Sequence, residues 1–368
     1  MKEKINMQAL FKVYEEEIAK NTKNKNKIVR FEKNKMQNMN YLIKRLRRGD
    51  YFIHHYNIFM ICEPKFRIVM SLPIKDKIVN HYVTRNILEP QLSKYLDPRN
   101  IATRKGMGTD FGIRKVKQYL ELNKKYDSFY ILKMDIQKYF YSIDHVILKK
   151  LLQDKLSDFD FQLLSHIIDS TNMPRINEII ETQKDTFLKK FPSRKAEIQA
   201  VPLYKKGKGL PIGNMTSQFL SIFYLYSLDH FIVHHLKIKH YIRYMDDFIF
   251  IHPNPEYLKE VRDKVIAILE QEYCLKVNQK KTKIVSAKEG FTFLGYTFKV
   301  SNKKTILKVN RKTSQKVIKS IRRKKYEFQK GYISYEQAFS SISTFKYSFK
   351  YGNSMRIQNA IEKYWFED

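Results

Sequence analysis

The chain has 368 residues, 43% of them hydrophobic and 14% aromatic, which excludes a disordered polymer and allows two or three packed subdomains. Its 70 Lys and Arg against 37 Asp and Glu give a formal net charge of +33, which predicts a polyanionic partner, nucleic acid before an anionic membrane. We find no run of about 18 apolar residues that would predict a membrane span, and no signal-peptide core at the N-terminus.

The two cysteines, Cys62 and Cys274, are far apart in the sequence. Their number excludes a disulfide framework and a four-cysteine zinc site. We expect both to be small core residues and the chain to be cytoplasmic, where thiols stay reduced.

The first 110 residues predict helices and then short strands. Residues 1–48 read as helical, with apolar side chains at helical spacing from Leu10 to Ile18. The basic segment NTKNKNK at 21–27 interrupts this pattern, and it either contacts an RNA backbone or is a solvated loop. Short strands and a helix are expected over 50–110.

The middle of the chain alternates between strand and helix patterns. The expected elements are a buried strand at 129–135, a helix from about 144, an insertion or flexible connection at 154–206, a long apolar helix at 214–236, a helix at 254–272 and strands near 282–300.

The last 60 residues or so predict a small basic helical domain. The pattern at 314–328 places apolar and basic side chains on opposite faces: Val317, Ile321 and Phe328 against Lys316, Lys319 and Arg323. SYEQ at 334–337 predicts a capping box, Gly352 a helix stop, and Ser354 the start of a third helix. The basic face either contacts nucleic acid or is solvated.

An acidic pair interrupts a strand-forming segment, HYIRYMDDFIFIH at 240–252. We expect strands at 241–245 and 248–252 with a tight turn at Asp246 and Asp247. Burying unpaired carboxylates is unfavourable, and a divalent cation relieves that cost. The alternative is an ordinary hairpin with a solvated Asp-Asp turn.

A second acid, Asp135, ends the strand in LKMDIQKYFYSID. Nucleotidyl transfer requires carboxylates from separate strands that converge on two Mg²⁺ ions, for which Mn²⁺ can substitute. Asp135, Asp246 and Asp247 meet that requirement if the two segments are neighbours, and the carbonyl of Ile136 is a further candidate ligand. Taken alone, Asp135 reads as a strand-ending residue in a turn.

Seven short motifs follow one another along the chain. They are EPKFRIVMSLPIKDKIVNHYV (63–83), ATRKGMGT (102–109), LKMDIQKYFYSID, GLPIGNMTSQFLSIFYLYSLDHF (209–231), YMDD, VNQKKTKI (277–284) and FLGY (293–296). In their identity and order they resemble the motifs of reverse transcriptases.

The resemblance implies an α+β fold of the right-hand polymerase type, with fingers, a palm built on an antiparallel sheet, and a helical thumb. The implied divisions are N-terminal helices and fingers at 1–130, a palm at 131–300 with an inserted fingers segment at about 185–240, and a basic helical thumb at 301–368. We expect no appended endonuclease. The implied activity is RNA-templated DNA synthesis from deoxynucleoside triphosphates.

The resemblance also implies roles for single residues, each of which could instead be an ordinary core or surface residue. The implied catalytic residues are Asp135, Asp246, Asp247 and Lys281, with Lys281 assisting protonation of pyrophosphate. The implied nucleotide-binding residues are Lys65, Arg67, Arg104, Lys105, Phe140 (a steric gate against ribose), Ile212, Gly213, Ser217 and Gln218. The implied primer grip contains Leu294 and Gly295.

One motif departs from the common family pattern. Ile212 replaces a Gln before Gly213, and Gln218 replaces a Pro after Ser217. In this respect LPIGNMTSQ resembles prokaryotic enzymes of diversity-generating retroelements, which copy RNA with errors opposite adenine. That subgroup implies a structured template RNA and a small basic accessory protein as partners. A homo-oligomer is the alternative to an accessory protein.

Two other interpretations stay open. The chain could be an antiphage-defence reverse transcriptase that makes cDNA from its own noncoding RNA. It could also be an RNA-binding module that has lost catalysis, although the intact acids Asp135, Asp246 and Asp247 oppose that interpretation.

Overall fold

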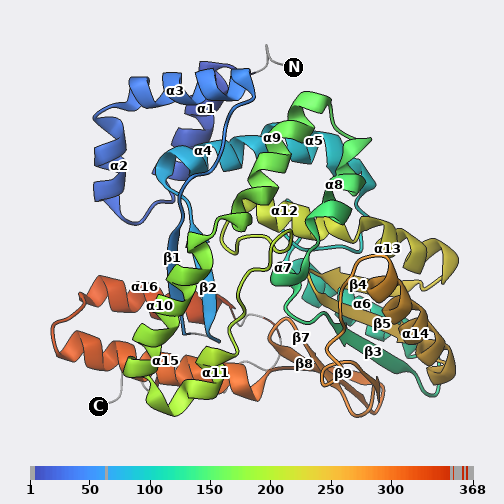
Figure 1. Ribbon diagram of the computed structural model, residues 1–368. Helices are drawn as coiled ribbons and strands as arrows, with labels where there is room; N and C mark the ends of the chain where they lie inside the picture. Colours follow the sequence, from blue (N-terminus) through green and yellow to red (C-terminus); the bar gives the residue numbers. More distant parts are fainter. Residues whose placement is uncertain (1–4, 63–64, 349–350, 352–358, 360–361, 364–368) are drawn as a thin grey trace. The chain divides into compact units, whose positions relative to one another are not determined.

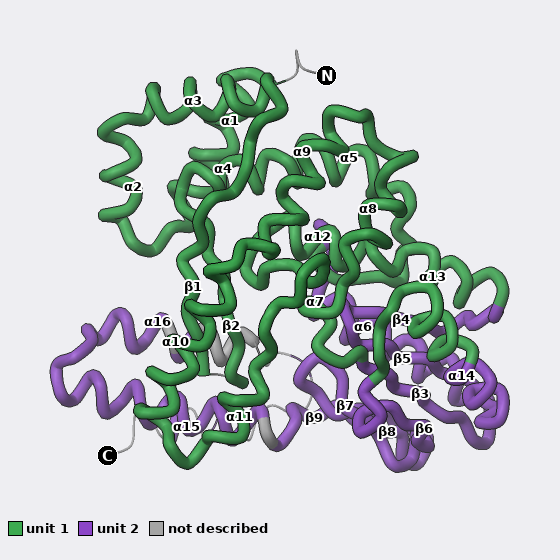
Figure 2. The backbone as a smooth tube through the Cα atoms, viewed as in Figure 1, with its two compact units in different colours: residues 1–103, 136–235, 264–277 green, residues 104–135, 236–263, 278–368 purple. Residues whose placement is uncertain are grey.

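The computed structural model describes residues 5–62, 65–348, 351, 359 and 362–363, and Figure 1 shows the arrangement of its elements. The chain divides into two compact units, each assembled from three separate stretches of sequence (Figure 2). Unit 1 comprises residues 1–103, 136–235 and 264–277, and unit 2 comprises residues 104–135, 236–263 and 278–368. The domain boundaries expected at residues 130 and 300 stay a prediction.

Unit 2 is built on a four-stranded antiparallel sheet with the order β4-β5-β3-β6. Its strands are rich in Ile, Phe, Val and Tyr, residues that pack well on a pleated surface. The helix α6 packs against β4 and β5 and buries Ile113, Val116 and Leu120. The bounds are α6 Thr109–Asn123, β3 Tyr130–Asp135, β4 His240–Tyr244, β5 Asp247–His252 and β6 Lys283–Ser286.

A second antiparallel sheet in unit 2 has the order β7-β8-β9 and leads into two helices. The expected capping box at 334–337 is confirmed, because Gln337 N donates to Ser334 Oγ and Ser334 N donates to Gln337 Oε1. Gly352 and Ser354 lie outside the described residues. The bounds are β7 Phe291–Phe293, β8 Tyr296–Ser301, β9 Lys304–Val309, α15 Arg311–Gln329 and α16 Tyr335–Ser348.

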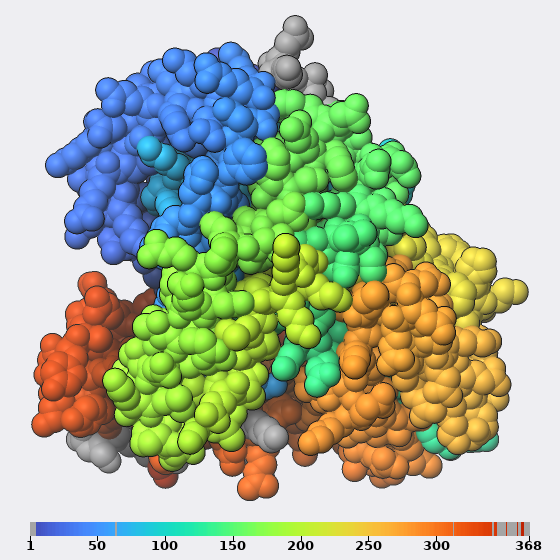
Figure 3. Space-filling view, in the orientation of Figure 1, coloured from blue at the N-terminus to red at the C-terminus, as the bar shows by residue number. Residues whose placement is uncertain are grey.

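Unit 1 is mainly helical, and its N-terminal helices pack together and against α4. Figure 3 shows these residues as a packed blue group with cyan residues of the 50–90 segment beside them. The bounds are α1 Met7–Val13, η2 Tyr14–Ala19, α2 Lys25–Glu32, α3 Lys35–Arg48, β1 Asn57–Ile61, β2 Arg67–Ser71, α4 Ile74–Val83, η3 Thr84–Leu88, α5 Glu89–Leu92 and η4 Ser93–Tyr95.

The segment 154–206 is helical over much of its length, which agrees with its partly helical sequence pattern and contradicts only the alternative of a flexible connection. Ile176 and Ile180 are buried on α10, and α10 packs on β1 of the β1-β2 hairpin. The bounds in this part of unit 1 are α7 Tyr139–Ser142, α8 His145–Gln153, α9 Asp158–Ile168, η5 Asp169–Asn172, α10 Arg175–Lys190, η6 Pro192–Arg194 and α11 Lys195–Gln199.

The expected helix at 214–236 is also wrong in one respect, because it is broken at Leu225. Tyr139 Oη donates to the carbonyl of Ser221, and Asn100 Nδ2 donates to the carbonyl of Ile222. These side chains replace the donors that a continuous helix would supply. The pieces are α12 Met215–Tyr224, α13 Tyr226–His230 and η7 Phe231–His235, and the helix α14 Pro255–Gln271 spans the boundary between the units in sequence.

The cysteines differ from expectation as well. Cys274 is exposed, with a φ of +53°, and Cys62 is half-buried, so neither is a core residue. Within the described residues, no helix combines the length and apolar content that crossing a bilayer requires.

Candidate active site

The acidic pair lies at the tip of the β4-β5 hairpin in unit 2. Tyr244 pairs with Asp247, which leaves Met245 and Asp246 as a two-residue turn. The expected turn at Asp246 and Asp247 is therefore displaced by one residue, and Asp247 begins β5. Met245 has a φ of +56°, and its carbonyl accepts a hydrogen bond from Arg243 Nη1 at 3.0 Å. A fully buried arginine thus stabilises a left-handed residue at the hairpin tip.

Asp135 ends β3 and stands directly opposite Asp247 in the antiparallel register. Its side chain is buried, and both carboxylate oxygens are engaged. Asn278 Nδ2 donates to Oδ1 at 3.2 Å, and Lys281 Nζ contacts Oδ2 at 2.5 Å. Lys281 is itself 44% exposed, so this ammonium group can leave the carboxylate without breaking the core.

Lys133 provides a second cation beside the acids, two residues before Asp135 on β3. Its Nζ lies 3.4 Å from Asp247 Oδ1 and donates to the carbonyl of Thr292 on β7 at 2.8 Å. Although this ion pair is close, Asp247 Oδ1 is a buried oxygen that accepts no hydrogen bond from any described residue. Asp247 therefore retains capacity for a further positively charged partner.

The electrostatics of the hairpin tip are unfavourable to the ionised acids. Burial, followed by the charges of Asp247 and Asp135, raises the pKa of Asp246 to about 6. Burial also raises the pKa of Asp247, against the opposing effect of Lys133. Desolvation and neighbouring like charge both disfavour the carboxylate form. A cation held by these acids would relieve both effects.

The donor set fits a hard divalent cation, since carboxylates are the ligands that Mg²⁺ prefers. As they stand, no three acidic, histidine or cysteine side chains in the described part of the chain are grouped closely enough to hold an ion. Lys281 and Lys133 each pair with one of the acids, Asp135 and Asp247 respectively. The orphaned oxygen of Asp247 and the raised pKa of Asp246 indicate a site that suits a metal better than its present partners.

The predicted loop-helix residues lie in unit 1 and are connected to two other predicted segments. Leu210 N donates to the carbonyl of Phe140 on α7 at 2.7 Å, and Met70 N on β2 donates to the carbonyl of Ile212 at 2.9 Å. Gly213 has a φ of +111°, and a Cβ there would meet Val69 Cγ1 at 3.1 Å. A side chain at this position would therefore be strained by both conformation and space.

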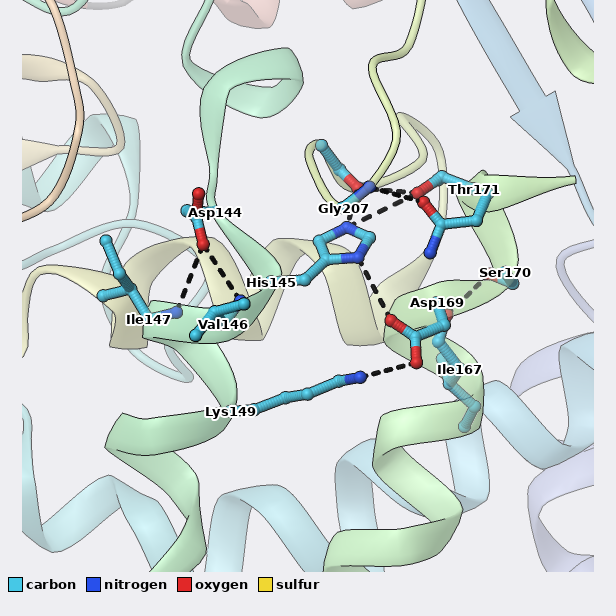
Figure 4. Close-up of polar contacts among 12 residues, drawn as sticks. Asp144, His145, Val146, Ile147, Lys149, Ile167, Asp169, Ser170, Thr171 and Gly207 are labelled. Atoms are coloured by element: carbon cyan, nitrogen blue, oxygen red, sulfur yellow. Dashed lines mark hydrogen bonds and ion pairs between the residues drawn. The ribbon is translucent and has the colours of Figure 1, made fainter.

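A buried histidine anchors the beginning of this loop (Figure 4). His145 Nε2 lies 2.8 Å from the carbonyl of Gly209, and Nδ1 lies 3.2 Å from Asp169 Oδ1. Lys149 contacts the other oxygen of Asp169 at 2.5 Å, and Thr171 Oγ1 donates to the same Gly209 carbonyl at 3.0 Å. The start of the GLPIG motif is thereby attached to α8 and η5.

The remaining predicted residues are distributed over both units. Lys65 and Arg67 are exposed at the start of β2, Arg104 is half-buried and Lys105 exposed in the turn before α6, and Ser217 is buried while Gln218 is half-buried on α12. Leu294 and Gly295, with φ of +48° and +84°, form the two-residue turn between β7 and β8. Ile136 is buried after Asp135 and bridges to Val277. The roles assigned to all of these residues stay predictions.

Sequence reasoning missed Lys133, Asn278 and Arg243. A signal existed for Lys133 and Arg243, because each is a charged residue inside an otherwise apolar strand. Asn278 carried no such signal, since its contact with Asp135 joins residues that are 143 apart in the sequence.

Comparison with known proteins defines the class. The chain folds as an α+β polymerase, and the family model described as reverse transcriptase (RNA-dependent DNA polymerase) matches residues 62–298, more than half of its length. The chain belongs to this family, and the predicted fold class and enzyme class are confirmed at that level. The family implies a divalent metal ion as cofactor.

Solved structures with detectable similarity include two telomerases. One is apo telomerase from Candida tropicalis truncated from its C-terminal domain, with 16% identity, a TM-score of 0.48, and coverage of 69% of this chain and 55% of that one. Another is telomerase from Candida albicans in complex with a TWJ fragment of telomeric RNA, with 15% identity, a TM-score of 0.43, and coverage of 72% and 48%. The chain thus spans about half the length of these structures. No curated protein matches it in sequence.

Proposed function

We propose that the chain is an RNA-directed DNA polymerase that copies template RNA into cDNA from a primer and deoxynucleoside triphosphates. The observation that carries this proposal is the pairing of Asp135 with Asp247 across β3 and β5, beside Asp246 at the hairpin tip. Two segments that are more than a hundred residues apart thus present three acids at one end of a sheet. Nucleotidyl transfer requires such convergence.

Asp135, Asp246 and Asp247, with the carbonyl of Ile136, are the proposed ligands of two Mg²⁺ ions, for which Mn²⁺ can substitute. When bound, the metal supplies charge stabilisation for the attacking 3′-hydroxyl and the departing pyrophosphate. The chain's own contribution is mainly positioning. Asn278 orients Asp135 through its amide hydrogen bond, and Lys133 holds Asp247 close to the β7-β8 hairpin.

Lys281 is the proposed proton donor to pyrophosphate. Its ammonium group pairs with Asp135 in the free protein, and it is exposed enough to reorient towards an anionic product. A charge-assisted contact to phosphate oxygens suits this group. A single movement of the Lys281 ammonium group would then both release Asp135 and bring the proton to pyrophosphate.

Nucleotide recognition is proposed for residues of both units. Lys65, Arg67, Arg104 and Lys105 would contact the triphosphate, and the ring of Phe140 would exclude a ribose 2′-hydroxyl. Ile212, Gly213, Ser217 and Gln218 would support the new base pair, and Leu294 and Gly295 the primer. We propose divisions corresponding to fingers (1–130), palm (131–300, with fingers residues at about 185–240) and thumb (301–368).

The direct test is primer extension on an RNA template with Mg²⁺. Asp246→Asn is expected to lower synthesis at least about a thousandfold, because a neutral amide is a poor ligand for Mg²⁺. Asp127→Asn, an exposed acid of unit 2, is the matched control and should retain wild-type synthesis. Equal extension by Asp246→Asn and the wild type would remove the acids from the mechanism.

Within this function we propose membership of the prokaryotic diversity-generating retroelement subgroup, with errors opposite adenine. The support is the motif LPIGNMTSQ, in which apolar Ile212 occupies a position that is often Gln. A missing side-chain hydrogen bond near the base pair would weaken discrimination. A structured noncoding RNA, a basic accessory protein and self-association are the corresponding proposed partners.

A fidelity assay tests this finer proposal. Ile212→Gln is expected to lower misincorporation opposite adenine roughly tenfold, because it restores a polar contact to the pair. Misincorporation is measured by sequencing the cDNA made on a defined RNA. An unchanged error spectrum in Ile212→Gln would favour an accurate enzyme, such as a defence reverse transcriptase.

A further inference from the structure

A polar cavity of about 360 Å³ lies wholly within unit 1, away from the acids of the β4-β5 hairpin in sequence and in unit. Three segments line it: the stretch from Glu17 at the end of η2 to Lys27 at the start of α2, the α4 region with Leu72 before it, and the Gly213–Met215 stretch at the start of α12. None of the three segments binds a ligand in the proposals above except through Gly213. The cavity is open at one side, so a group attached to a chain can enter it.

Two residues of the cavity lining, Asn80 and Asn214, each have a buried side-chain N–H donor without a partner among the described residues. Asn80 is 2% exposed, and its Oδ1 accepts from both the backbone nitrogen and the hydroxyl of Thr216, at 3.0 and 3.1 Å. Those two bonds fix the amide so that Nδ2 is its free end. Within the described residues, the Nδ2 atoms of Asn80 and Asn214 both lack a partner, and Asn214 is 4% exposed. Buried donors without acceptors are costly, which points to a missing ligand with acceptor atoms.

The charges around the cavity favour an anion. Lys23, Lys27 and Lys77 line it, and burial, followed by the charge of Lys27, lowers the pKa of Lys77. Glu17 is the acid in the lining, but it forms an ion pair with Arg85. His81 lies 3.8 Å from Glu17, and burial lowers its pKa, so it adds no strong positive charge. Lys23 and Lys27 are exposed, and none of the three lysines forms an ion pair with an acid among the described residues.

The backbone adds to this preference. The ten-residue helix α12 begins at Met215, and its cap residue Asn214 makes no capping bond with its side chain. The N-terminus of a helix carries partial positive charge and exposed N–H groups, which suit phosphate oxygens. Gly213 precedes this end of the helix and has a φ of +111°, a conformation that glycine adopts without strain.

We propose that this cavity binds one backbone phosphate of a nucleic-acid strand. Lys23, Lys27 and Lys77 supply charge, and the amides of Asn80 and Asn214 donate to phosphate oxygens. A strand fits better than a free anion, because the cavity adjoins Gly213, which is proposed to lie beside the new base pair. In that respect the inference rests on the polymerase function proposed above, with the phosphate belonging to the template strand.

The test measures binding without catalysis, in the full chain carrying Asp246→Asn and without metal. The probe is a primer paired to a template RNA in which one template phosphate at a time is replaced by an uncharged methylphosphonate. At one template position, replacing the phosphate is expected to raise the Kd about tenfold, which is the effect of losing one charge-assisted contact. In the double variant Lys27→Gln and Lys77→Gln, the same replacement should cost no more than about twofold, because the protein partner is already missing.

The matched control is Lys33→Gln with Lys44→Gln, which removes the same charge from exposed positions outside the cavity. In this control, the methylphosphonate at the one sensitive position should still weaken binding about tenfold. If the double variant folds poorly, Lys27→Gln alone is used, and it should reduce that methylphosphonate effect in part. Melting curves verify folding. Equal penalties in the pocket and control variants at every position would overturn the proposal.

A second arm distinguishes a strand from a free anion. Inorganic phosphate is added to the wild type and to the pocket variant, and the melting temperature is measured. The proposal would also be overturned if phosphate stabilised only the wild type and no methylphosphonate position weakened binding. Failure of the polymerase function gives a different result, namely no primer extension by the wild type with Mg²⁺. The binding measurement stands in either case, because it uses a variant that need not catalyse.

Discussion

The acidic hairpin of unit 2 and the lysine-lined cavity of unit 1 share one physical property and differ in how they are built. Each gathers like charges in a partly buried place, and each contains a buried polar atom that makes no hydrogen bond with the described residues. The hairpin contains acids already paired with lysines. The lysines of the cavity have no comparable acid dedicated to them.

The two regions therefore differ in how their side chains are held in the absence of a ligand. Lys281 pairs with Asp135, so one acid of the proposed metal site already has a cationic partner in the free protein. In the cavity, by contrast, hydrogen bonds from Thr216 fix the amide of Asn80. We therefore expect changes in the hairpin to alter the rate of synthesis, and changes in the cavity to alter affinity for the nucleic acid.

The largest expected effect separates rate from affinity. Asp135→Asn should reduce the rate of synthesis on saturating primer–template at least about a thousandfold while changing the Kd for nucleic acid less than about threefold. The pocket variant Lys27→Gln with Lys77→Gln should show the reverse pattern, with a raised Kd and a nearly unchanged saturated rate. Single-turnover extension and anisotropy measure the two quantities. A large rate loss in the pocket variant would break the comparison.

An intermediate effect concerns the cationic partner of Asp135. Lys281→Gln should lower synthesis roughly tenfold, because it removes the group proposed as proton donor to pyrophosphate. The same change should strengthen binding of Mn²⁺ by roughly threefold, because a competing positive charge leaves Asp135. Electron paramagnetic resonance of Mn²⁺ in the free protein measures that affinity. Lys280→Gln, an exposed neighbour, serves as the control. Weaker Mn²⁺ binding in Lys281→Gln would show that the lysine assists the metal instead of replacing it.

The smallest expected effect tests whether both places are strained by their own charge. In the absence of metal and nucleic acid, Asp246→Asn should raise the free energy of unfolding by about 1 kcal/mol, since it removes a charge that is disfavoured by burial and then by repulsion from Asp247 and Asp135. Lys77→Gln should have the same sign and a smaller size, for the corresponding reason in the cavity. Denaturant unfolding in a chelator measures both. Loss of stability in both variants would contradict the shared property of the two regions.

The strands and the acids of the hairpin site are predictable from sequence alone. Strand-forming residues around YMDD, and an acid at the end of LKMD, were sufficient to predict β3, β4 and β5 and the three acids. That information is local, because a strand's apolar composition and its terminal acid occupy adjacent positions in the chain. The capping box at Ser334 was predictable for the same reason.

The contacts that these residues make, in contrast, depend on how distant segments pack together. The register that sets Asp135 against Asp247, the bond from Asn278 and the break at Leu225 all depend on contacts between distant segments. The cavity forms only where three segments meet. One of them, residues 21–27, is equally compatible in sequence with a solvated loop. Long-range packing chooses such contacts from shape and burial, and these leave no periodic trace in the sequence of any one segment.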